Sequence, residues 1–71
     1  MKRENIGRAV ELSELHKRLE MCRDLLLGGC SPCVESASGE VYYIHDEIIR
    51  WDTIASINKR IDNINKEFEE L

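Results

Sequence analysis

The stretch that decides the fold is residues 54–71, IASINKRIDNINKEFEEL. Its apolar side chains recur at intervals of three and four residues in turn, which is the a/d spacing of a coiled-coil seam. We therefore predict a helix that buries one apolar stripe, and a lone helix has nothing against which to bury it. The predicted oligomer seam consists of Ile54, Ile57, Ile61, Ile64 and Phe68, with Leu71 as its last member.

A second seam of the same spacing lies in the first part of the chain, and it predicts a helix over residues 5–27. Gly28 and Gly29 follow at once, and glycine adopts the left-handed conformation that ends a helix. On the outer face Glu14 precedes Arg18 by four residues, which favours an ion pair. The members of this seam are Leu12, Leu15, Leu19, Cys22 and Leu26.

Between the two seams the chain changes to the pattern of a β-hairpin, over residues 33–45. Pro32 excludes a helix at this point. Residues 41–44 are β-branched or aromatic, and the small polar residues 36–39 before them are typical of a turn. A two-stranded hairpin is marginally stable alone in water. We therefore expect the hairpin to pack on the helices or to pair with a hairpin from another copy.

The second helix is predicted over residues 47–70. Asp46 is a short acceptor side chain suited to cap its first turn, and Ile48 and Trp51 are expected to lead into the seam. Residues 1–71 are thus expected to be a single domain, mainly α with a small β component, in the order helix, β-hairpin, helix.

Two antiparallel helices of this kind are predicted to pack into an oligomeric helical bundle. Isoleucine at successive a and d positions favours three or four strands in parallel coiled coils. A chain this short buries only about 60% of the surface that its unfolded form exposes, so self-association is expected to add stability. We expect a dimer, a tetramer or a larger homo-oligomer; the alternative is a monomeric two-helix hairpin.

Composition excludes several classes of protein. The net charge is −4, with 14 acidic and 10 basic residues, and no basic run resembles a nucleic-acid footprint. The longest apolar run, residues 25–27, is too short to cross a bilayer. Residues 1–5, MKREN, lead straight into polar residues and into no secretory segment. We therefore expect a cytoplasmic protein with no membrane partner, in which structural disulfides are disfavoured.

Cys30 and Cys33 have the C-x-x-C spacing of redox and zinc motifs. They follow the end of a helix, where the helix dipole does not lower a thiol pKa, and a structural zinc site needs four ligands. We predict no metal and no cofactor, with Cys22 in the core and one of the other two cysteines buried. Neither His16 nor His45 has a nucleophile at a telling spacing, so we predict no enzyme.

Four residues are candidates for binding a ligand. Tyr42 and Tyr43 point to opposite sides of a strand, so one is expected to cover the helices and the other to face solvent or a partner. An exposed ring beside Arg50, and beside Arg23 or Arg18 from another helix, would stack on a planar anion and pair with its charge. The alternative is that both tyrosines seal the small core.

The order of elements resembles that of the beta-type prefoldin subunits, in which two coiled-coil arms flank one hairpin and hairpins assemble the subunits. The resemblance implies that a hairpin between helices can serve as an oligomerisation edge. We expect a non-catalytic homo-oligomeric binding protein, an adaptor or inhibitor of a larger partner, encoded by a phage or mobile element. The alternative is an oligomer that sequesters a small anionic ligand, such as a nucleotide signal, in pockets between subunits.

Overall fold

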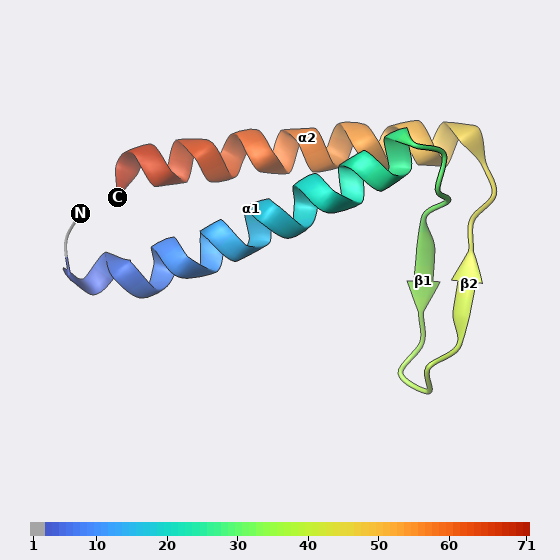
Figure 1. The fold of residues 1–71 in the computed structure, drawn as a ribbon, viewed down its shortest axis with the longest axis horizontal. Coiled ribbons are helices and arrows are strands. Elements are labelled where there is room, and N and C mark those ends of the chain that lie inside the picture. Colours follow the sequence, from blue (N-terminus) through green and yellow to red (C-terminus); the bar gives the residue numbers. More distant parts are fainter. Residues whose placement is uncertain (1–2) are drawn as a thin grey trace.

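The computed structural model describes residues 3–71 as two long antiparallel helices with a β-hairpin between them (Figure 1). This confirms the mainly α, helix–β-hairpin–helix class, and α1 begins one residue after its predicted start. Neither helix is long and apolar enough to cross a membrane. The elements are a 3₁₀ turn at Arg3–Asn5, α1 at Ile6–Leu27, β1 at Cys33–Glu35, β2 at Val41–Tyr43 and α2 at Glu47–Glu70.

The two apolar stripes face each other along the helical arms, and they make the core. Leu15, Leu19, Ile57 and Phe68 are half-buried between the arms. The stripe that needs a partner helix thus finds one in its own chain. Packing of several copies along the seam stays a prediction, and burial of the seam does not require it. The buried side chains are Leu12, Leu26, Ile54, Ile61 and Ile64, of which Leu12 and Ile64 are fully buried.

Polar contacts join the arms at the end where the described chain begins and ends. The Nε and Nη2 groups of Arg8 on α1 donate to the two carboxylate oxygens of Glu67 on α2, at 3.1 and 3.2 Å. The side-chain amide of Asn5 donates to the carbonyl oxygen of Leu71 at 3.5 Å. The two ends of the described chain therefore lie together, at the opposite end of the arms from the hairpin (Figure 1).

Local capping fixes where each helix stops or starts. Gly29 has φ +105°, and the N–H groups of Gly29 and of the residue after it donate to the carbonyls of Leu26 and Leu25 at 3.1 and 3.0 Å. This is the Schellman arrangement, which needs a left-handed residue. At the start of α2 the Asp46 carboxylate accepts from the N–H of Ile49 at 3.0 Å, which confirms the predicted N-cap.

The hairpin stands away from the arms, so the molecule is shaped like an L, with extents of 44 × 27 × 15 Å (Figure 1). No Cα of either strand comes within 8 Å of a helix Cα, and all strand residues are exposed. The expectation that the hairpin packs on the helices is therefore wrong for the single chain. The strands are antiparallel and pair Cys33 with Tyr43, Val34 with Tyr42 and Glu35 with Val41.

Candidate functional site

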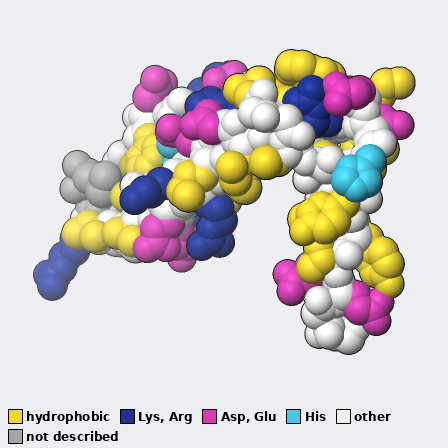
Figure 2. Space-filling view, turned by 45° about the vertical axis from the view of Figure 1, so that its right-hand side comes forward, with side chains coloured by type: hydrophobic (Ala, Val, Ile, Leu, Met, Phe, Trp, Pro, Cys, Tyr) yellow, Lys and Arg dark blue, Asp and Glu magenta, His cyan; other side chains and the backbone are white. Residues whose placement is uncertain are grey.

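The hairpin exposes apolar side chains on both of its faces. Strand alternation separates Tyr42 from Tyr43, yet both rings are exposed, by 60% and 63%. The prediction that one tyrosine covers the helices is wrong, because the hairpin stands clear of them. Figure 2 shows hydrophobic side chains on the flanks of the hairpin and acidic ones nearer its free end. We call the face that carries Cys33, Glu35, Val41 and Tyr43 the Tyr43 face.

Each tyrosine has a neighbour that fixes its ring. The Tyr42 hydroxyl donates to the Glu40 carboxylate, and this hydrogen bond raises the pKa of Tyr42. The Tyr43 ring stacks on His45, with centroids 6.1 Å apart and planes inclined by 21°. Ser31 holds His45 in turn, through a hydrogen bond of 2.9 Å between its hydroxyl and Nδ1. The rings are thus oriented without burial.

The guanidinium of Arg50 is hydrogen-bonded to groups of its own chain. Its Nε and Nη2 donate to the Glu47 carboxylate at 3.3 and 2.8 Å, and its Nη1 donates to the Leu26 carbonyl at 2.5 Å. The bond to Glu47 raises the pKa of Arg50, and the same interaction lowers the pKa of Glu47. The guanidinium carbon also lies 4.8 Å from the centroid of the Trp51 ring, within the range of a cation–π contact.

Arg23 is also held against the arms. Its Nε lies 3.5 Å from the Asp24 carboxylate, and its Nη1 donates to the Asn58 side-chain oxygen at 3.5 Å. Within residues 3–71, no hydrogen bond joins either predicted arginine to Tyr42 or Tyr43. The single chain therefore does not bring the four predicted ligand-binding residues together.

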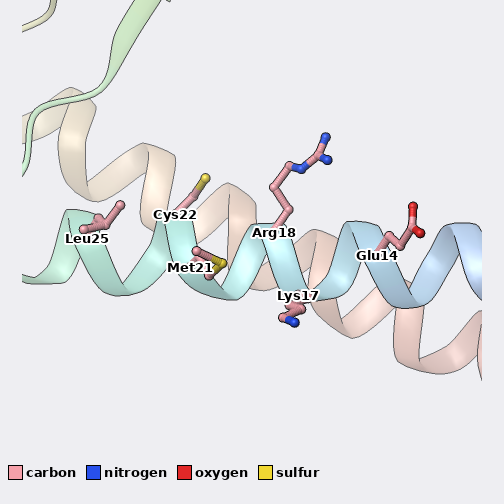
Figure 3. Close-up of a pocket in the computed structure, with 6 residues that line it drawn as sticks. All are labelled: Glu14, Lys17, Arg18, Met21, Cys22 and Leu25. Carbon is pink, nitrogen blue, oxygen red and sulfur yellow. The ribbon is translucent and has the colours of Figure 1, made fainter.

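Two connected grooves run along the outer side of α1 and into the corner beneath the hairpin. The first has a volume of about 420 Å³, lies wholly on α1 (Figure 3) and is named the α1 trough. The second, of about 350 Å³, shares Cys22 and Leu25 with the trough. The trough is lined by Glu14, Lys17, Arg18, Met21, Cys22 and Leu25. The corner groove adds Leu26, Cys30, Ser31, Pro32, Cys33, Thr53 and Ile57.

The trough holds two basic side chains that have no acidic partner. The predicted ion pair between Glu14 and Arg18 does not form, and Lys17 and Arg18 take part in no salt bridge among the described residues. Figure 3 shows Arg18 extending from the helix into open space. The trough therefore combines an apolar floor with two basic side chains and one acidic side chain, Glu14, none of which forms a salt bridge among the described residues.

The cysteines lie elsewhere than the sequence predicted. Cys22 is exposed rather than part of the core, and Cys30 and Cys33 are both exposed. All three are free thiols that line the corner groove. His16 lies apart from them, with Nδ1 2.6 Å from the Glu20 carboxylate. In residues 3–71, no three His, Cys, Asp or Glu side chains gather closely enough to hold a metal ion.

Sequence reasoning missed the apolar residues outside the seam. Met21 and Leu25 floor the trough, and Ile48 and Trp51 are exposed at the start of α2 instead of leading into the seam. A large apolar side chain off the three–four stripe is the signal that finds these positions. Comparison of the chain with protein-family models, curated proteins and solved structures gives no match.

Proposed function

We propose that the protein is a non-catalytic homo-oligomeric binding protein, in which the hairpin joins the copies and the helical arms present a surface to a larger partner. The observation that supports it is the exposure of every strand residue, including Val34, Val41, Tyr42 and Tyr43. An isolated two-stranded hairpin is marginal in water, and its open edges readily pair with another chain. Contact with a second copy would stabilise the hairpin and cover its open strand edges.

The arms favour the hairpin as the contact between copies. Ile54, Ile61 and Ile64 are already buried within the chain, so the seam has little apolar surface left to offer. No strand residue of the hairpin is buried against the helices of its own chain. Assembly through the hairpin therefore gains burial that the folded chain does not already have.

The start of α2 is the surface that we assign to the larger partner, for which the protein would act as adaptor or inhibitor. Ile48, Ile49 and Trp51 are exposed there, and the Arg50 guanidinium lies over the Trp51 ring. Tryptophan and arginine are the residues most enriched at the energetic centres of protein interfaces. A rigid helix face with both is well suited to bind another protein.

The mass of the protein in solution tests assembly. Light scattering coupled to gel filtration at micromolar concentration should give a multiple of 8.3 kDa. Val41→Lys, on the hairpin, should reduce the mass to that of one chain, because it places charge in the contact. Ile48→Lys, the matched control on the arms, should leave the assembly intact. A wild-type protein that is a single chain at every concentration would contradict the proposal.

The partner surface has a separate test. Trp51→Ala should keep the assembled mass and lose the larger partner in a pull-down from host lysate. Thr53→Ala, two residues along the same helix, is the control and should retain the partner. Equal capture by the wild type and by Trp51→Ala would show that the partner binds elsewhere.

A further inference from the structure

We propose that the hairpin of one copy lies in the α1 trough of a second copy, and that the second hairpin lies in the trough of the first. The Tyr43 face is the face that docks. This inference rests on the proposed function, and it adds the surface that receives the hairpin and the symmetry of the pair. Three features support it: the chemistry of the two surfaces, their lengths and the L shape of the molecule (Figure 1).

The α1 trough changes from apolar to basic along its length. Leu25 and Met21 form its apolar part, next to the corner of the L, and Lys17 and Arg18 follow toward the middle of the arm (Figure 3). Residues four apart lie on the same side of a helix, so Lys17, Met21 and Leu25 make one continuous row. Lys17 and Arg18 form no salt bridge in the described chain, and Glu14 stands beyond them at the far end of the trough.

The Tyr43 face changes from apolar to acidic in the same direction from the corner. Tyr43 and Cys33 pair at the base of the hairpin, and Val41 and Glu35 pair nearer its free end. Glu35 takes part in no salt bridge among residues 3–71, whereas Glu40 on the opposite face is occupied by the Tyr42 hydroxyl. The Tyr43 face thus carries the available carboxylate.

The two surfaces also match in length. Residues 14–25 of a helix span about 16 Å at 1.5 Å per residue. Residues 32–37, which run from the corner through β1 into the turn, span at most about 17 Å at 3.3 Å per residue. With the Cys33–Tyr43 pair over Leu25, Glu35 and its partner Val41 both lie about 7 Å further along, level with Met21, and the Glu35 side chain extends from there toward Arg18 and Lys17.

The L shape makes this docking reciprocal. A two-fold axis that bisects the corner exchanges the direction of the arms with the direction of the hairpin, so each hairpin runs along the arms of the other copy. Such an interface is isologous, because the same two patches meet twice. The operation places the base of the hairpin at the Leu25 end of the trough, which is the orientation that the charges require.

The molecule exposes enough surface to bury the area that a stable dimer requires. A stable dimer buries about 800 Å² per partner, roughly one seventh of the 5585 Å² that the chain exposes. Each copy contributes a hairpin face and a trough, so two separate contacts share that area. The corner grooves of the two copies, with their thiols, would meet near the axis.

Charge reversal tests the pairing of Glu35 with Lys17 and Arg18. Glu35→Lys in one protein and Lys17→Glu/Arg18→Glu in another should each weaken self-association by about tenfold or more, because like charges meet twice per dimer. Mixing the two proteins should restore a dimer, since both contacts are then complementary. Lys59→Glu/Arg60→Glu, a matched basic pair on the exposed side of α2, should leave the dimer unchanged. Native mass spectrometry and light scattering measure each outcome.

The results separate this inference from the proposed function. Two weakened homodimers and a restored mixed dimer would support the docking of the hairpin in the trough. Unchanged assembly in both charge-reversed proteins, together with its loss in Val41→Lys, would overturn the docking and leave assembly through the hairpin in place. A wild-type protein that is always a single chain would overturn both.

Discussion

Ile64 is the residue on which the packing of the arms depends most. Its side chain is 0% exposed in the middle of the seam, whereas Ile48 on the same helix is 73% exposed. Ile64→Ala should lower the free energy of unfolding by about 2–5 kcal/mol, because it leaves a cavity in a small core. Ile48→Ala, the same chemical change, should alter it by less than about 0.5 kcal/mol. Urea denaturation followed by circular dichroism measures both, and equal losses would show that the seam is not the core.

Glu47 makes the stability of the fold depend on pH. The hydrogen bond from Arg50 lowers the pKa of Glu47 below its usual value of 4.5. The stabilising interaction is therefore fully present above that value and is lost as the pH falls through the lower pKa of the folded state. Glu47→Gln should be less stable than the wild type at pH 7, and the difference should shrink in acid.

Urea midpoints at neutral and acidic pH measure this effect. Asp52→Asn removes a carboxylate from the same helix, and Asp52 has no salt bridge in the described chain. On acidification, the difference in urea midpoint between the wild type and Glu47→Gln should shrink. The difference between the wild type and Asp52→Asn should change far less. An identical difference at both pH values would exclude the Arg50 pairing as the cause.

The elements could be predicted where the sequence carries strong local signals. The paired glycines end α1, and Asp46 starts α2, because capping depends on a few neighbouring atoms. The position of the hairpin could not be predicted, since it depends on the backbone direction through residues 30–32 and 44–46. Periodicity also does not tell whether a seam is covered by the same chain or by another. The exposure of Cys22 has the same origin, because it depends on where the second helix lies.

The end of α1 depends on one backbone conformation, which gives a prediction at the scale of the element. Gly29 has φ +105°, whereas Gly7 lies inside the helix, with open space where the Cβ of another residue would stand. Gly29→Ala should destabilise the protein by about 1–2 kcal/mol, because an L residue is strained there. Gly7→Ala should stabilise it by less than about 1 kcal/mol, because Gly7 lies in the first turn of the helix rather than in its middle. Thermal melts report both, and shifts of the same sign would contradict the assignment of the cap.

The molecule as a whole divides its apolar surface between a buried seam and an open hairpin. If the hairpin docks on a second copy, folding and association are linked, and the melting temperature should rise with protein concentration. Calorimetry over about a hundredfold range of concentration measures this dependence. In Glu35→Lys, the melting temperature should depend less on protein concentration. A wild-type melting temperature that is constant over the range would show that the copies do not stabilise one another.

The meeting of Asn5 with Leu71, at the opposite end of the arms from the hairpin, has a consequence for engineering. A short linker across that gap would close the backbone into a ring, and new termini could be opened in the turn at residues 37–38. Such a circular permutant would keep both arms and cut the hairpin at its free end. A fluorescent protein fused after Leu71 would instead sit far from the hairpin and report on assembly without obstructing it (Figure 1).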